Sequence, residues 1–146
     1  MMLKSDLPLL LASERFDGDT TGSQPLDRLR MQKGVFLLEM RGPPSWRDLF
    51  DFGPYDWGPY SRDLASTVEH LVAEGCLEKD RLPRRRYHAY RTTSLGEESI
   101  SEQLNPREER FVAKVRDFVT SRSFAQLLRD VYAAHPEYAS RSRFRG

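Results

Sequence analysis

The stretch from Phe50 to Leu77 constrains the fold more than any other part of the 146-residue chain. It begins with two copies of Gly-Pro-Tyr, at 53–55 and 58–60. Proline fixes the backbone φ angle and glycine tolerates positive φ, so each Gly-Pro pair predicts a tight bend. The aromatic rings around these bends have few places to go, and we expect them to share a core. They are Phe50, Phe52, Tyr55, Trp57 and Tyr60.

A helix and then two strands are expected directly after the second bend. Ser61 can cap the N-terminus of the helix, and Gly75 has the position typical of a C-terminal stop. The apolar face of the helix repeats at helical spacing and consists of Leu64, Val68, Leu71 and Val72. Residues 77–93 then predict two strands around a turn at 80–83. A bend, a helix and a strand pair form the second half of a winged-helix unit.

Further helices are expected on both sides of this centre. The predicted helix at about 26–40 is apolar over more than one face, which is typical of a central helix buried on two sides. Capping patterns predict other helices that start near Asp6, Ser94, Asn105 and either Ser121 or Ser123. The sequence therefore predicts a mostly α fold with a small antiparallel β-hairpin, a winged-helix-like domain with extra N- and C-terminal helices. We expect this single domain to cover 1–139, followed by a flexible basic tail at 140–146.

Composition argues against several classes of function. The net charge of +1 gives no overall attraction to nucleic acid or to anionic membranes. The longest apolar run, 7–12, is far too short to span a bilayer, so we expect a cytoplasmic protein without membrane contact. Cys76 is the only cysteine, and the three histidines lie in separate predicted elements, so we expect no metal site. Because no phosphate-binding loop or nucleophile–base pair occurs at motif spacing, we expect no catalytic residue, no cofactor and no enzymatic activity.

One segment is locally basic. Residues 81–91 contain no acid, and aromatic residues lie between the arginines. With the arginine at the start of the preceding helix, the candidate nucleic-acid-binding residues are Arg62, Arg81, Arg84, Arg85, Arg86 and Arg91. A basic hairpin tip can contact the phosphate oxygens of DNA, whereas the alternative is a solvated loop with arginine stems along the strand. The preceding helix argues against base readout, because Asp63, Glu69 and Glu74 on its outer face would repel phosphates.

The aromatic residues of the doubled motif also have two interpretations. As core residues, they pack the helices together. As an interface, Tyr55, Trp57 and Tyr60 are candidate partner-binding residues, because aromatic side chains are enriched where proteins meet. The core interpretation predicts that four side chains are buried: Phe36, Trp57, Leu64 and Leu71.

Several segments resemble one family of uncharacterised prokaryotic proteins, the YwgA-like family. They are Asp6–Leu11, Arg28–Leu38, Tyr55–Ser61, Gly75–Leu77, Leu127–Tyr132, His135–Ala139 and Ser142. Two motifs are more distantly similar to the Panacea (SocA-like) antitoxin domain, namely Gln-Lys…Phe-Leu-Leu and Tyr-Asp-Trp-Gly-Pro. The most recurrent positions of the family are matched by Gln32, Lys33, Tyr55, Trp57, Gly58, Pro59 and Tyr60. The chain departs from the family at Gly34, where leucine is usual, and at Pro8.

The resemblance implies a helical domain with a winged-helix-like centre and a role in regulation, toxin neutralisation or mobile-element and defence biology. It carries over no catalytic residue. We therefore expect a non-enzymatic, winged-helix-like regulator that binds DNA through its hairpin. The alternative is an antitoxin-like or adaptor protein that binds another protein through the aromatic Gly-Pro-Tyr region. A homodimer is compatible with either function.

Overall fold

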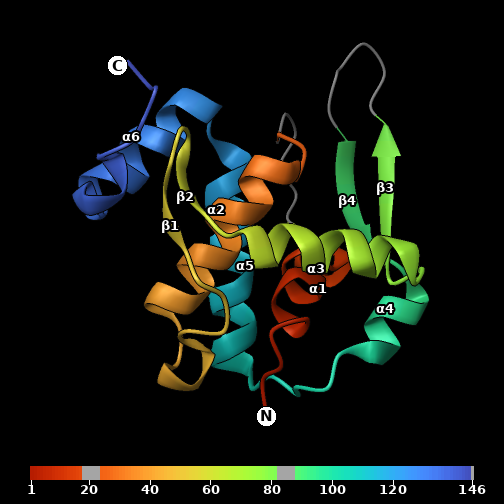
Figure 1. The fold of residues 1–146 in the computed structure, drawn as a ribbon. Helices are drawn as coiled ribbons and strands as arrows, with labels where there is room; N and C mark the ends of the chain where they lie inside the picture. The colour runs from red at the N-terminus through yellow and green to blue at the C-terminus, as the bar shows by residue number, and fades with distance from the viewer. Residues whose placement is uncertain (18–23, 82–87, 146) are drawn as a thin grey trace.

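The structure is a computed structural model that describes residues 1–17, 24–81 and 88–145. Within these ranges the chain forms six α-helices and two antiparallel hairpins (Figure 1). The helices are α1 (Asp6–Leu11), α2 (Arg28–Arg41), α3 (Arg62–Ala73), α4 (Ser94–Ser99), α5 (Pro106–Ser121) and α6 (Phe124–Ala134). The strands are β1 (Gly53–Tyr55), β2 (Gly58–Tyr60), β3 (Leu77–Arg81) and β4 (His88–Thr92). Short 3-10 turns occur at Glu14–Phe16, Pro44–Trp46 and Pro136–Ala139.

The predicted fold class is confirmed. The described residues are mostly helical, and α3 is followed directly by the small antiparallel hairpin β3–β4, whose register runs from Leu77 opposite Thr92 to Arg81 opposite His88. Ser61 caps α3 as predicted, since its Oγ accepts a hydrogen bond from the Leu64 backbone at 3.1 Å. The turn predicted at 80–83 is wrong at its start, because residues 80 and 81 pair with β4 and belong to β3.

Helix α2 forms the centre of the fold, as its two apolar faces predict. Every residue from Arg30 to Glu39 is buried, and α2 contacts α1, α3, α5 and β2. The structure gives a reason for Gly34, where the YwgA-like family usually has leucine. A Cβ atom at this position would collide with the Leu11 side chain of α1. Gln32 joins α2 to the start of α3: its amide donates to the Ser61 carbonyl at 3.0 Å and accepts from the Ser61 N–H at 2.8 Å.

The doubled Gly-Pro-Tyr motif does not form two bends. The two copies are the two strands of one hairpin, with Pro54 opposite Pro59 and the turn at 56–57. Cross-strand pairing places each proline in an edge position, where its missing N–H costs no ladder hydrogen bond. Gly58 has a φ of +92°, so the conformational freedom of glycine is used at the second copy.

The predicted core is confirmed at three positions and wrong at one. Phe36, Leu64 and Leu71 are buried, whereas Trp57 is 40% exposed. The reason is the turn between β1 and β2, which places Trp57 at the tip of a hairpin instead of inside an aromatic cluster. Phe50 is buried, and Phe52 packs against Phe36 with 5.4 Å between the ring centroids.

Residues 140–145, expected to be a flexible tail, contact the turn of the β1–β2 hairpin. The Arg143 N–H donates to the Asp56 carbonyl at 2.8 Å, and Tyr132 Oη bonds to Ser142 Oγ at 2.6 Å. The division into a domain at 1–139 and a tail stays a prediction. In the described ranges, no helix combines the length and the apolar character needed to cross a membrane.

Candidate functional site

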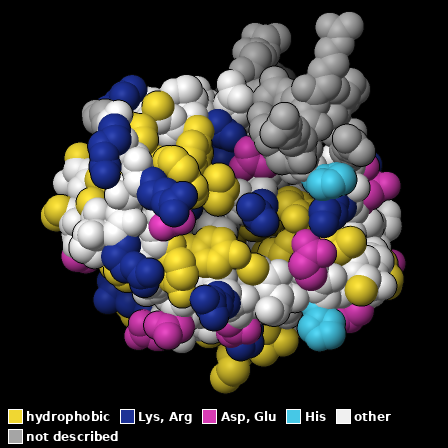
Figure 2. All heavy atoms as spheres, turned by 45° about the horizontal axis from the view of Figure 1, so that its top comes forward, with side chains coloured by type: hydrophobic (Ala, Val, Ile, Leu, Met, Phe, Trp, Pro, Cys, Tyr) yellow, Lys and Arg dark blue, Asp and Glu magenta, His cyan; other side chains and the backbone are white. Residues whose placement is uncertain are grey.

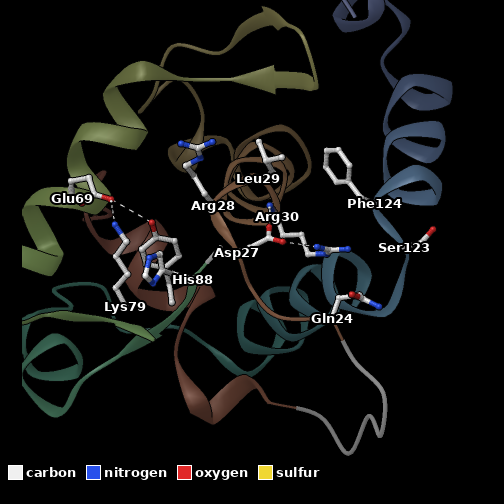
Figure 3. Close-up of a pocket in the computed structure, with 11 residues that line it drawn as sticks. Gln24, Asp27, Arg28, Leu29, Arg30, Glu69, Lys79, His88, Ser123 and Phe124 are labelled. Carbon is white, nitrogen blue, oxygen red and sulfur yellow. Dashed lines mark hydrogen bonds and ion pairs between the residues drawn. The ribbon is translucent and has the colours of Figure 1, made fainter. Parts of the chain in front are cut away.

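A cleft of about 570 Å³ opens where the start of α2 meets α3, the β3–β4 hairpin and the start of α6 (Figure 3). Its described lining is Gln24, Asp27, Arg28, Leu29, Arg30, Glu69, Lys79, His88, Tyr90, Ser123 and Phe124. Figure 2 shows hydrophobic side chains gathered on this face of the molecule, with Lys and Arg side chains among them. The volume suits a small ligand or one or two side chains of a partner.

The N-terminus of α2 forms the floor of the cleft and is fixed by a buried ion pair. Asp27 caps the helix by accepting from the Arg30 N–H at 2.9 Å, and it also binds Arg30 Nη1 at 2.7 Å. Arg30 Nε in turn donates to the Val119 carbonyl at 3.0 Å, which ties α2 to the end of α5. Because Asp27 and Arg30 satisfy each other, Arg28 between them is left exposed at the cleft and has no ion pair with any described carboxylate.

The opposite wall consists of paired polar groups. Glu69 of α3 forms an ion pair with Lys79 Nζ at 3.4 Å and accepts a long hydrogen bond, also 3.4 Å, from Tyr90 Oη. Burial, reinforced by the Glu69 charge, raises the pKa of Tyr90 to about 12. The Tyr90 backbone donates to the Leu26 carbonyl at 3.0 Å, so β4 is held against the residue that precedes the α2 cap.

The apolar end of the cleft connects it to the β1–β2 hairpin. The Phe124 ring lies with its centroid 6.3 Å from that of Trp57, near Leu29 (Figure 3). A second hollow of about 290 Å³ shares Arg28, Glu69 and Tyr90 with the cleft and reaches Tyr60. Two of the three predicted partner-binding residues, Trp57 and Tyr60, are therefore next to the cleft.

Tyr55 completes the predicted aromatic set on the same hairpin. Its ring is 5.2 Å from that of Tyr60, measured between centroids, and Arg141 lies 5.8 Å from its centroid. The structure therefore brings Tyr55, Trp57 and Tyr60 together on one hairpin, all of them partly or largely accessible.

The structure does not bring the described nucleic-acid-binding candidates together. Arg62 is exposed at the first position of α3, and Arg81 ends β3. Arg91 is exposed on β4 but contacts three carboxylates, those of Glu78, Asp80 and Glu14, which raise its pKa. Phosphate would have to displace these carboxylates. The other three candidates, Arg84, Arg85 and Arg86, lie outside the described residues.

Sequence reasoning missed most of the cleft. Arg28, Lys79 and Phe124 were not singled out, because they come from three elements far apart in the chain. The floor of the cleft could have been predicted in part. Asp27 in front of a helix is a strong N-cap, and the residue after an N-cap lies at the first position of the helix. Among the described residues, no cluster of His, Cys, Asp and Glu could hold a metal ion.

Lys33 is one of the residues that carry the YwgA-like resemblance, but the sequence analysis did not predict where its side chain lies. Its side chain is 0% exposed, and its Nζ has no hydrogen-bond partner among the described residues. Burial lowers its pKa to about 7, an effect that the charge of Asp27 partly opposes. A Cβ atom on Gly58 would lie 3.6 Å from this Nζ, so the amine is directly beneath β2.

No protein-family model matches the chain, and no curated protein matches it.

Proposed function

We propose that this chain is a non-enzymatic domain that recruits or neutralises another polypeptide, which it binds through the β1–β2 hairpin. The observation that carries the proposal is the exposure of Trp57, a large aromatic side chain that is 40% accessible at a hairpin tip. Tryptophan and tyrosine dominate the binding energy of protein interfaces, and Tyr55 and Tyr60 lie on the same hairpin.

The hairpin is also pre-organised, which supports the proposal. Gly58 and Pro59 are buried, the two prolines restrict the backbone, and the segment after α6 binds the turn at Asp56. A rigid tip loses little conformational entropy when a partner covers it. The regulatory, toxin-neutralising or defence setting implied by the YwgA-like and Panacea resemblance fits such a binding role.

The test starts from the protein purified from its native source together with whatever polypeptide co-purifies. Trp57→Ala should weaken binding of that polypeptide by about 30-fold, which corresponds to about 2 kcal/mol. Leu95→Ala is the matched control, because Leu95 is another exposed apolar side chain, 51% accessible on α4. Equal affinities of the Trp57→Ala and Leu95→Ala variants would contradict the proposal.

DNA binding is a second candidate function, and the observation in its favour is the β3–β4 hairpin. It extends away from the helices at its far end (Figure 1), and the sequence places Arg84, Arg85 and Arg86 in its connection. Changing these three arginines to glutamine should flatten the slope of log affinity against log salt by roughly three units on a random duplex. Absence of binding by the wild-type protein at low salt would eliminate this candidate.

A further inference from the structure

Among the described residues that line the cleft between α2, α3 and α6, one cation has no carboxylate partner. Its described lining holds three cations (Arg28, Arg30 and Lys79) and two carboxylates (Asp27 and Glu69), which gives a net charge of +1 when His88 is neutral. Arg30 is paired with Asp27 at 2.7 Å, and Lys79 is paired with Glu69 at 3.4 Å. The unneutralised charge is therefore that of Arg28.

An arginine in this state is suited to a planar anion. The guanidinium group presents its N–H donors in a fixed fork that matches a carboxylate. A phosphate dianion fits less well, because Asp27 and Glu69 line the same cleft and the other two cations are already paired. Charge complementarity thus favours a group with a single negative charge.

The neighbourhood of Arg28 adds a requirement for an apolar group. In Figure 3, Leu29 and Phe124 lie on one side of Arg28, and Glu69, Lys79 and His88 lie on the other. Phe124 also contacts Trp57, so an apolar side chain placed here would continue the surface of the β1–β2 hairpin. A ligand that fills the cleft carries a carboxylate next to an aromatic or large aliphatic group.

We infer that the cleft binds a carboxylate of the partner polypeptide together with an adjacent apolar side chain. The carboxylate, from an acidic residue or a C-terminus, pairs with Arg28, and the apolar side chain packs on Leu29 and Phe124. This inference rests on the proposed function, which supplies the polypeptide, and it names the chemistry that the partner must present beside the Trp57 contact.

The test uses a minimal probe, N-acetyl-L-phenylalanine, and its uncharged counterpart N-acetyl-L-phenylalaninamide, titrated into the full chain and followed by amide NMR shifts. The acid should bind at least about tenfold more tightly than the amide at low salt. Hydrogen bonds between the guanidinium group and a carboxylate are stronger than those to a neutral amide, because both partners are charged. The shifts should concentrate on residues 27–30 and 123–124.

Arg28→Gln should bring the acid and the amide to within about twofold of each other. Arg107→Gln is the matched control, since Arg107 is an exposed arginine in the first turn of α5, outside the cleft, and should leave the preference unchanged. Equal binding of acid and amide by the wild-type protein, shifts elsewhere, or no binding of the acid at millimolar concentration would overturn the inference. Tighter binding of inorganic phosphate than of the acid, lost in Arg28→Gln, would also overturn it in favour of a phosphate site.

A Trp57→Ala variant separates this inference from the proposed function. If the acid binds as expected while Trp57→Ala leaves partner binding intact, the cleft assignment stands and the hairpin assignment fails.

Discussion

The β1–β2 hairpin is held mainly by packing, whereas the β3–β4 hairpin is held by hydrogen bonds at its base. Gly58 of β2 lies so close to α2 and α6 that a Cβ atom there would be 3.0 Å from Lys33 Cε and 3.2 Å from Leu128 Cδ2. In β4, by contrast, the Thr92 N–H donates to the Ala12 carbonyl at 3.1 Å, and its hydroxyl donates to the Leu9 carbonyl at 2.6 Å.

The two hairpins also expose different chemistry. The packed hairpin presents aromatic side chains, with Trp57 at its tip, whereas the described part of the other presents charged side chains that pair with one another, such as Arg91 with Glu78. Two antiparallel hairpins in one small fold can therefore have different roles. Charged side chains that already pair with one another, as on the described part of β3–β4, are less available to a partner than their number suggests.

The largest expected effect concerns Lys33, on which the packed hairpin rests. Burial lowers the pKa of Lys33 from its ordinary value of 10.5 to about 7 in the folded protein, so the unfolded chain binds more protons between these pH values. The wild-type protein should therefore gain stability as the pH rises from 7 towards 10.5. Lys33→Met should stabilise the protein by about 4 kcal/mol at neutral pH and by only about 1 kcal/mol near pH 10.

Urea unfolding at the two pH values measures this difference. Lys114→Met on α5 is the control for replacing a lysine by methionine, because Lys114 is exposed. A Lys33→Met variant that is less stable than wild type at neutral pH would mean that the amine is charged and has a partner in the folded protein.

The next effect compares the two copies of Gly-Pro-Tyr. Gly58→Ala should destabilise the protein by about 2–3 kcal/mol, because alanine is strained at positive φ and its Cβ would press on Lys33 and Leu128. Gly53→Ala should cost less than about 1 kcal/mol, since among the described residues a Cβ there meets the Tyr55 ring alone, at 3.4 Å or more. Thermal unfolding of both variants checks the prediction, and equal losses would show that β1 and β2 are packed alike.

The smallest effect tests the hydrogen-bonded base of the other hairpin. Thr92→Val should cost about 1 kcal/mol, because it removes the bond to the Leu9 carbonyl while keeping the shape of the side chain. Thr67→Val on α3 is the control, since the Thr67 hydroxyl has no hydrogen-bond partner within the described residues. If both variants unfold at the wild-type urea concentration, the base of β3–β4 depends on packing as well.

Local patterns were sufficient to predict the helices and several of their caps. The cap of α4 was predicted one residue too late, because Thr93 and not Ser94 accepts the hydrogen bond from the Gly96 N–H. The apolar repeat from Leu64 to Leu71, the Ser61 cap and the Asn105–Glu108 capping box each depend on residues within one or two helical turns. The β1–β2 hairpin could not be predicted in the same way, because Gly-Pro is compatible with a bend and with an edge strand. The choice is made by cross-strand pairing and by packing on α2, and Trp57 was placed in the core for that reason.

The cleft was harder to predict, because its chemistry is assembled from distant segments. Arg28, Glu69, Lys79 and Phe124 become neighbours only once α2, α3, β3 and α6 are packed. Lys33 is different, since a lysine within a helix predicted to be buried on two sides was already visible in the sequence. Its burial follows from that prediction and could have been stated with it.

The most direct test of the account measures both hairpins in one experiment. The partner captured by the wild-type protein is titrated against Trp57→Ala, Leu95→Ala and the triple Arg84, Arg85 and Arg86 to glutamine variant. Polypeptide binding should weaken by about 30-fold in Trp57→Ala alone and stay near the wild-type value in the other two. Loss of binding in the triple variant with no change in Trp57→Ala would contradict the account and assign the interaction to the β3–β4 hairpin.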